Sequence, residues 1–543
     1  MVNPYSTVTI GRFAYERWTL TDALRENLTQ RPGRVALRSP DATLTYQEVW
    51  DRACELAGGL RATGISAGDR VFTMLDNSVD YALALIALNF VGAVAVPTNT
   101  MYKGAILTHV VADSGARTAL VEARYLDTLS RFDGGLLTTV VVRGASEAAA
   151  EPRTGDVPGR RLLPFAELRL GGTAIEPLER HVWDPLLIGY TSGTTGKSKG
   201  VVLTNAHMFQ AADPDTIQGM QGGKDEVVYI VCPMFHILGI GGMVTAFVVG
   251  GSAYIEERFS ASTFIVDATR VGATHALLVA TMGEFLMRQP LRDSDAECSI
   301  RTAYMNPVHS RHKEFTARFG IALRSSYGST EVGGVIATGA DQNAIDRISC
   351  GKPRPGVQIR LVDEHDIEVP VGEPGECIVR HVYPWTLCMS YLDNLQATAD
   401  AWRNGWFHTG DLLRRDSDDY YYFVDRAKDA IRRRGENVSS LEVEREVLAH
   451  DEVVGCAAVA VDTEEFEQEI KVLVVLCPDS ALTEEALTTF LIDRLPRYAV
   501  PRFVRFVEDL PRTPTGKVRK DRLRRESSEG CWDREAAGIV VPR

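Results

Sequence analysis

One stretch of the chain has the composition of a phosphate-binding loop. Residues 187–200 read LIGYTSGTTGKSKG, in which an apolar run leads into a segment rich in glycine, serine and threonine. Glycines let backbone N–H groups approach an anion closely, hydroxyls add further donors, and Lys197 and Lys199 add positive charge. A Walker A loop is excluded, because Thr191 stands where that pattern requires a glycine. Since the apolar run VVLT follows directly, a phosphate loop between two strands is favoured over a flexible linker.

Four other candidate groups carry a signal only through the residues around them. Lys517 lies in a basic tail, where a lysine is ordinarily a solvated surface charge. His236 follows Pro-Met-Phe and, taken alone, is more often a core histidine with satisfied hydrogen bonds. Glu331 and Asp411 would be unremarkable as isolated acids. Their interpretation therefore depends on the motifs that contain them.

These motifs, taken in order, resemble those of the adenylate-forming (AMP-binding) superfamily. The loop resembles its signature, and five further segments follow in the family's order: PMFHILG (233–239), YGSTE (327–331), HTGDL (408–412), VDRAKDAIRRRGENVSSLEVE (424–444) and PRTPTGKVRK (511–520). The resemblance covers nearly the whole chain. It points to the acyl-CoA synthetase branch, and the section between Leu238 and Glu331 looks nearest to carnitine-CoA ligase-like enzymes.

The resemblance implies a role for each motif. It places His236 beside the acyl carboxylate, Mg²⁺ on Glu331, the ribose hydroxyls on Asp411 and Arg426, and Lys517 on the triphosphate. The catalytic residues so implied are Lys517, His236, Glu331 and Thr191. The implied ATP and AMP site consists of Thr191, Ser192, Gly193, Thr194, Thr195, Gly196, Lys199, Asn306, Ser326, Tyr327, Gly328, Ser329, Thr330, Asp411, Arg426 and Lys517. The implied acyl pocket consists of His236, Ile237, Leu238, Thr281, Met282, Ser329 and Gly333.

The chemistry that this set implies is adenylation followed by thioester formation. A carboxylate attacks the α-phosphorus of ATP and expels pyrophosphate, so two anions must meet and charge develops in the transition state. Mg²⁺, the N–H groups of the loop and the ammonium of Lys517 would neutralise that charge. The acyl group then passes to the thiol of coenzyme A as co-substrate.

In this family a small C-terminal domain rotates between the two half-reactions. The resemblance makes Lys428 the hinge and Gly435 the lining of the thiol path, where a side chain would obstruct the thiol. Arg432 and Arg433 could meet CoA phosphates or form a solvated basic face. The sequence also departs from the family: Ser198 replaces a common proline, Arg434 replaces a common glycine, and residues 303–311 (AYMNPVHSR) replace a Gly-rich turn.

Several alternatives remain open at this stage. The acceptor could be the phosphopantetheine arm of a carrier protein, or the adenylate could serve otherwise, as in relatives that activate nitrite to diazotise an aryl amine. A ligase acting on preformed acyl-AMP is opposed by Lys517. A non-catalytic nucleotide-binding regulator is opposed by the complete set of Glu331, Asp411, Arg426 and Lys517. A luciferase-type oxygenase is opposed because no feature of the sequence indicates the use of oxygen.

The elements that must position these residues are those of an α/β protein. Strand-like runs (116–122, 137–143, 226–232 and 274–280) alternate with helical patterns (47–63 and 80–90), which favours layers of helices on mostly parallel sheet. Short antiparallel strands are expected from about Val357, and a small α+β unit after Asp425. We therefore predict an N-terminal AMP-binding domain (1–425, with a β-rich subdomain at about 350–425), a hinge (426–430) and a mobile C-terminal domain (431–543).

Composition sets limits on the partners. A net charge of −13 disfavours nucleic acid and anionic membrane surfaces as partners. The resemblance implies a small-molecule carboxylic acid as the partner. The apolar stretches 81–96 and 237–255 are interrupted by asparagine or glycine, so each is predicted to be a buried helix followed by a buried strand. Nine dispersed cysteines suit a reducing cytoplasm, where we expect the protein. A homodimer remains open.

Overall fold

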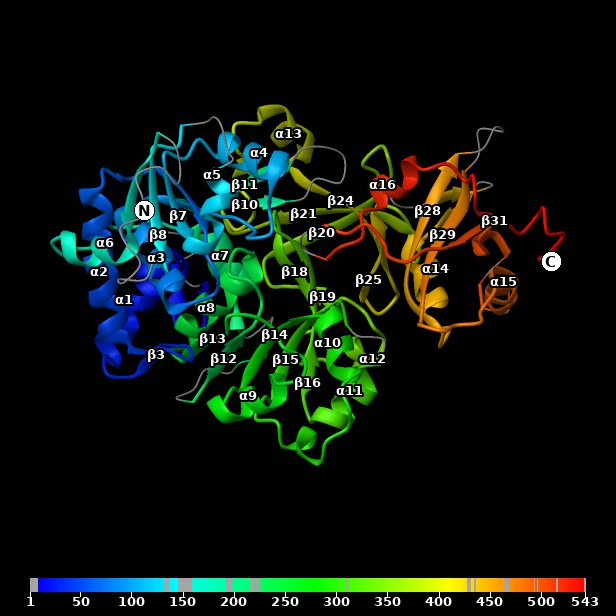
Figure 1. Ribbon diagram of the computed structural model, residues 1–543, viewed down its shortest axis with the longest axis horizontal. Helices are drawn as coiled ribbons and strands as arrows, with labels where there is room; N and C mark the ends of the chain where they lie inside the picture. The colour runs from blue at the N-terminus through cyan, green and yellow to red at the C-terminus, as the bar shows by residue number, and fades with distance from the viewer. Residues whose placement is uncertain are drawn as a thin grey trace.

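The computed structural model describes most of the chain. The described residues are 8–130, 136–144, 159–191, 198–214, 220, 225–308, 311–426, 431–433, 436–462, 468–492, 494–495, 497–513 and 516–541. Figure 1 shows the N-terminal elements gathered in a large α/β body and the C-terminal elements at one end of the molecule, beyond β25.

The first large sheet carries the phosphate-loop strands. Its order is β22 (Ser390–Tyr391), β11 (Lys199–Thr204), β10 (Pro185–Thr191), β6 (Val94–Pro97), β5 (Arg70–Met74), β7 (Thr118–Glu122), β8 (Thr139–Arg143) and β9 (Arg161–Pro164). The pairings from β10 through β6 to β9 are parallel, whereas β11 is antiparallel to both β10 and β22. The antiparallel pair at this edge is what a loop joining adjacent strands requires.

The second large sheet runs in the order β16 (Ala322–Arg324), β15 (Thr302–Asn306), β14 (His275–Val279), β12 (Val227–Ile230), β13 (Ser252–Ile255), β3 (Val35–Arg38) and β4 (Thr43–Thr45). Its strands pair in parallel except at β3–β4. Alternation of strands and helices over both sheets confirms the predicted α/β class.

Helices join the two sheets into one core. The longer ones are α1 (Leu20–Gln30), α2 (Tyr46–Ala62), α3 (Val79–Val91), α4 (Gly104–Ser114) and α8 (Ile237–Val249). Helix α3 packs on β6, α8 packs on β12, β13 and β14, and α1 contacts both helices. Both apolar stretches form a buried helix followed by a buried strand, α3 with β6 and α8 with β13, as predicted. Among the residues that the structure describes, no helix is long and apolar enough to span a membrane.

The β-rich section follows as expected from its Gly/Pro turns. Strands β20 (Val357–Val362), β21 (Pro374–His381), β24 (Trp406–Arg415) and β25 (Tyr421–Arg426) pair in antiparallel fashion. A smaller sheet contains the hairpin of β17 (Ser326–Ser329) and β18 (Gly333–Ala337). Gly328 is required here, because a Cβ at that position would lie 1.7 Å from the carbonyl oxygen of Gly333.

The C-terminal domain has its own core. Its elements are β26 (Ile431–Arg433), β27 (Glu436–Val438), α14 (Ser440–Leu448), β28 (Val453–Asp462), β29 (Gln468–Leu476), α15 (Glu484–Ile492), β30 (Phe503–Phe506), α16 (Lys520–Arg525) and β31 (Trp532–Asp533). Strands β28 to β31 form a four-stranded sheet, against which apolar side chains of α14 and α15 pack. The predicted boundaries at residues 425 and 431 stay predictions.

Candidate active site

Glu331 lies at the turn between β17 and β18, and both of its carboxylate oxygens are held. Ser329 Oγ donates a hydrogen bond to Oε2 over 2.9 Å, and the Tyr391 hydroxyl donates to Oε1 over 3.0 Å. The Glu331 carbonyl also accepts a bond from the backbone N–H of Cys388. The carboxylate therefore has a fixed orientation, and its remaining lone pairs are available to a cation.

The flanks of the phosphate loop adjoin this carboxylate. Thr191 and Lys199 are paired across the β10–β11 ladder, while the loop between them (192–197) lies outside the described residues. Strand β22 pairs with β11 and places Tyr391 beside Lys199, whose ammonium lies 4.8 Å from the centre of the Tyr391 ring. A Cβ at Gly189 would lie 3.1 Å from Thr330 Cγ2, so β10 itself runs against the Glu331 turn. The structure thus brings both ends of the loop to Glu331.

A second polar cluster lies where β24 and β25 pair. Asp411 is opposite Arg426 in the register, and Arg426 Nε lies 3.1 Å from Asp411 Oδ1. The Tyr327 hydroxyl donates to Asp411 Oδ2 over 2.8 Å. Burial raises the pKa of Asp411, and the positive charge of Arg426 opposes that shift. An aromatic ring, a carboxylate and a guanidinium thus meet at one point, which suits a base and a ribose.

The tail lysine belongs to the same site. Burial lowers the pKa of Lys517, as does the positive charge of Arg426, whereas the carboxylates of Asp411 and Glu331 raise it. Its ammonium is therefore close enough to all three groups to respond to their charges, although the side chain remains open to solvent. Lys517 comes from the C-terminal domain, so the two domains meet there.

His236 precedes α8 and lies close enough to Lys517 to respond to its charge. Its Nδ1 accepts a hydrogen bond from the backbone N–H of Leu238 over 3.2 Å, so the neutral ring carries its proton on Nε2. Burial, together with the smaller effect of the positive charge of Lys517, lowers the pKa of His236 to about 4. At neutral pH the residue is therefore an uncharged donor, which can bind a carboxylate or phosphate oxygen.

The predicted acyl-pocket residues occupy three elements. Ile237 and Leu238 begin α8, Thr281 and Met282 lie in the first turn of α10 (Ala280–Met287), and Ser329 and Gly333 pair across the hairpin. Helix α8 packs on β14, whose end leads directly into α10.

Two polar side chains that the sequence did not identify, Gln210 and His207, lie close to Gly333. A Cβ at Gly333 would lie 2.9 Å from Gln210 Oε1 and 3.7 Å from His207 Nε2. Both side chains are buried on α7 (Asn205–Ala211). The sequence gives a signal in retrospect, because two polar residues three positions apart on a short helix share one face.

The nucleotide-site residues of β15 and β17 lie side by side. The Tyr304 hydroxyl and Ser326 Oγ are 2.7 Å apart, and Tyr304 also bonds the side chain of Asn306 at the end of β15. Residues 303–311 differ from the Gly-rich turn of the family, but they still place Asn306 at the end of its strand, next to Ser326. Residues 309 and 310 lie outside the described part of the chain.

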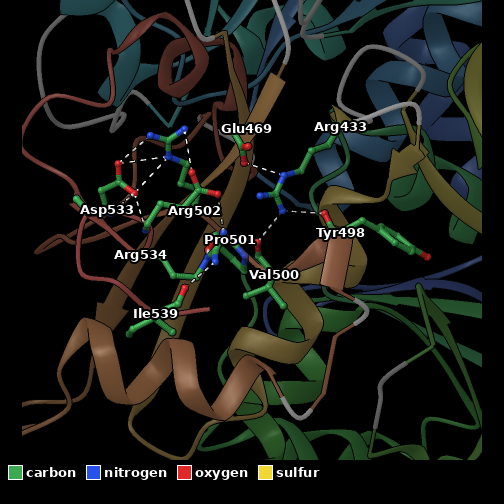
Figure 2. Close-up of polar contacts among 11 residues, drawn as sticks. Arg433, Glu469, Tyr498, Val500, Pro501, Arg502, Asp533, Arg534 and Ile539 are labelled. Atoms are coloured by element: carbon green, nitrogen blue, oxygen red, sulfur yellow. Dashed lines mark hydrogen bonds and ion pairs between the residues drawn. The ribbon is translucent and has the colours of Figure 1, made fainter. Parts of the chain in front are cut away.

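One expectation about coenzyme A is wrong. Arg433 is buried, forms a 2.7 Å ion pair with Glu469, and donates to the carbonyl oxygens of Tyr498 and Val500, as Figure 2 shows. It neither reaches solvent nor offers its guanidinium to a phosphate. Lys428, Arg434 and Gly435, and the side chain of Arg432, lie outside the described residues, so their roles stay predictions.

Tyr391 is a second residue that sequence reasoning missed. It reaches Glu331 only through the pairing of β22 with β11, two strands far apart in the chain. No local pattern in SYLDN distinguishes this tyrosine from a surface aromatic residue.

Family models agree with this geometry. The model described as AMP-binding enzyme matches residues 24–391, and the model of the AMP-binding enzyme C-terminal domain matches residues 442–517. The chain belongs to the AMP-binding enzyme family. The resemblance inferred from the motifs is thereby confirmed.

The curated relatives of this AMP-binding enzyme include CoA ligases. Feruloyl-CoA synthase of Amycolatopsis sp is 30% identical over 91% of this chain and 96% of its own length. Sulfoacetate–CoA ligase of Cupriavidus necator is 31% identical over 93% and 97%, and crotonobetaine/carnitine–CoA ligase of Citrobacter koseri is 30% identical over 85% and 89%. The carnitine-type likeness predicted from the sequence is thus among them.

Solved structures of the family share the fold. ATP-bound MatB from Rhodopseudomonas palustris has a TM-score of 0.80 at 25% identity, covering 92% of this chain and 98% of its own. The anthranilate CoA ligase AuaEII in complex with anthranoyl-AMP has a TM-score of 0.82 at 23% identity, covering 95% and 98%. The second likeness shows the fold alone.

Proposed function

We propose that the protein is an AMP-forming acid–thiol ligase. It activates a small carboxylic acid with ATP, releases pyrophosphate, and transfers the acyl group from the adenylate to coenzyme A. The observation that carries this proposal is the meeting of Lys517, Glu331, Asp411 and Arg426 at one site formed by two domains. The names of the relatives supply the acceptor, since each is a CoA ligase.

The nucleotide would lie between the two polar clusters. Asp411 and Arg426 suit the ribose hydroxyls, because a carboxylate accepts and a guanidinium donates. Tyr327 would lie beside the base, with Ser326 and Asn306 at the edge of the base. The loop from Thr191 to Lys199 would surround the phosphates.

Glu331 fits a magnesium ion. Mg²⁺ in nucleotide sites is usually held by one or two carboxylates together with substrate phosphates. The described residues contain no group of three or more His, Cys, Asp or Glu side chains placed to hold a metal by themselves, which agrees with such a shared site. When bound there, Mg²⁺ would neutralise charge on the phosphates.

Two further residues would act on the reacting groups. Neutral His236 would donate its Nε2–H to the acid's carboxylate and orient it for attack, without adding a proton that would quench the nucleophile. Lys517 would supply positive charge where the pentacovalent phosphorus and the leaving pyrophosphate gain negative charge. Both groups act through position and charge, as adenylation requires.

The thiol step would use the predicted hinge. Lys428 would absorb the rotation of the domain after residue 430, and Gly435 would line the path of the thiol. A carrier-protein thiol is the second candidate acceptor, since the same segment would admit any pantetheine arm. Arg434, which stands where the family commonly has a glycine, would lie next to that path.

A pyrophosphate-release screen tests the proposal. Purified protein with Mg²⁺ and ATP is offered a panel of carboxylic acids that includes ferulate, sulfoacetate and carnitine, each with and without CoA. We expect acid-dependent pyrophosphate release, and an acyl-CoA product only when CoA is present. ATP hydrolysis that no acid stimulates, or an adenylate that CoA never consumes, would overturn the proposal.

A further inference from the structure

A buried polar network joins the end of β25 to the start of α14. The backbone N–H and Oγ of Ser440 both donate to Asp425 Oδ2 over 2.6 Å, and Ser439 Oγ donates to the carbonyl oxygen of Val424 over 2.5 Å. Asp425 is only 2% exposed and Ser440 is fully buried. The predicted hinge lies between these partners in the sequence, so the network connects the two sides of the hinge.

The same network includes the segment that carries Lys517. Lys520 Nζ donates to Ser440 Oγ over 2.5 Å and forms a 2.8 Å ion pair with Glu444 Oε1. Ser440 Oγ therefore donates to Asp425 and accepts from Lys520. The backbone N–H of Ala458 also donates to Glu444, which fixes that carboxylate on the domain's central sheet. Lys520 begins α16, three residues after Lys517.

The position of Asp425 links the network to the nucleotide site. Its carboxylate accepts from the first N–H of the nine-residue helix α14, where the helix dipole favours an anion. The next residue, Arg426, forms the ion pair with Asp411. Two consecutive residues of β25 therefore have different partners. Asp425 holds the start of α14 in the C-terminal domain, and Arg426 holds Asp411, the carboxylate proposed to bind the ribose.

We propose that Asp425, Ser440 and Lys520 are positioning residues for the adenylation half-reaction. They hold the C-terminal domain in the pose that brings Lys517 to Glu331 and Asp411, and thiol transfer from a finished adenylate does not need them. This inference rests on the proposed function. It assigns to the three residues no contact with substrate.

A polar network inside the C-terminal domain provides the matched control. Arg502 forms a 3.1 Å ion pair with Asp533 (Figure 2). Arg502 directly precedes β30, and Asp533 ends β31, its neighbour in the same sheet. This pair does not involve β25. Breaking it should destabilise the domain without changing its pose.

The experiment compares two half-reactions in the full-length protein. The first is pyrophosphate release with ATP and one acid that the wild-type screen selects, ferulate being tried first. The second is thiolysis by CoA of the synthetic acyl-AMP of the same acid. Asp425→Ala and Lys520→Met should each slow pyrophosphate release by at least about tenfold, because a misplacement of a reacting group by about 1 Å can lower the rate on the order of 100-fold. Thiolysis of the synthetic acyl-AMP should stay at the wild-type rate.

Further variants keep the test decisive. Ser440→Ala, which removes only the shared hydroxyl, should show a smaller loss of adenylation and covers the case in which Asp425→Ala does not fold. Lys520→Arg should restore most of the rate. Arg502→Met should lower the melting temperature while leaving the ratio of the two half-reactions unchanged.

Two results would overturn the inference. One is an equal loss of both half-reactions in the Asp425 and Lys520 variants, which would leave their ratio unchanged as in Arg502→Met, and the other is no loss of either half-reaction. Failure of the proposed function is a different outcome, since the wild-type protein itself would then release no pyrophosphate with any acid. In that case hydrogen exchange at the start of α14, compared between wild type and Asp425→Ala, still reports whether the network holds the domain.

Discussion

Two buried polar networks of the C-terminal domain use the same kinds of bond for different purposes. The network of Arg433 and Glu469 pairs strands within the domain and reaches the backbone carbonyls of the segment around Tyr498 (Figure 2). The network of Asp425, Ser440 and Lys520 extends from β25 of the large domain into α14 and α16. The first network lies wholly within the domain, whereas the second also includes a residue of β25, so only the second would depend on the position of the domain.

This difference has consequences for stability and for activity. Removing one partner of a buried ion pair is strongly destabilising, because a charge is left without its partner away from water. In the internal network that loss should appear as reduced stability alone. In the network across the hinge it should also appear as a change in the balance of half-reactions. The following predictions compare the two kinds of effect.

The largest effect is expected inside the domain. Arg433→Met removes the ion-pair partner of Glu469 and should cost about 3–5 kcal/mol of unfolding free energy. Chemical denaturation followed by circular dichroism measures the loss. The double variant Arg433→Met/Glu469→Leu should recover most of it, and a single variant as stable as wild type would show that the pair is not a constraint on the domain.

Lys517→Ala should produce the next largest effect, and only on adenylation. Loss of a preorganised charge at a developing anion costs about 100- to 1,000-fold in rate. Thiolysis of synthetic acyl-AMP should continue. Arg519→Ala, which changes an exposed residue of the same tail, is the control and should keep both rates. Equal loss of both half-reactions in Lys517→Ala would contradict the two-pose mechanism.

Tyr391→Phe should weaken the magnesium site by a smaller amount. It removes the O–H that orients Glu331, and a hydrogen bond to a charged group contributes about 1.5–3 kcal/mol when fully buried, less at this half-buried site. The apparent affinity for Mg²⁺ should fall about tenfold, as measured by Mn²⁺ binding with ATP present. Tyr422→Phe removes a comparable bond to Asp416 away from the site and should have no effect.

The pH dependence of adenylation should show the smallest change. Because the pKa of His236 is lowered to about 4, the ring is already neutral at pH 5 and stays neutral as the pH rises. The rate should therefore show no inflection near pH 6.5. A step near pH 6.5 that disappears in His236→Asn would mean that the imidazole titrates normally and is neither buried nor close to Lys517.

Sequence patterns predicted the elements whose signals are local. The glycine-interrupted apolar stretches became α3 with β6 and α8 with β13, and the Gly/Pro-rich section from Val357 became an antiparallel sheet. The motifs also identified Glu331, Asp411, Arg426 and Lys517, which the fold brings together from two domains. Their individual chemical roles remain predictions.

What the sequence could not provide depends on pairings between distant segments. Tyr391 reaches Glu331 through β22–β11, and Asp425 reaches Lys520 through α14, so neither has a local pattern. Arg433 is different, because a signal was present. Ile431 and Arg433 are two positions apart in β26, so their side chains lie on the same face of the strand. A strand that buries Ile431 therefore also buries Arg433.

A structure of the protein with ATP and Mg²⁺ tests the central claim most directly. We predict the metal on Glu331, the ribose on Asp411, and the Lys517 ammonium beside the phosphates, with residues 191–199 around them. A nucleotide bound away from Glu331, or a bound complex in which Lys517 faces solvent away from the phosphates, would contradict it.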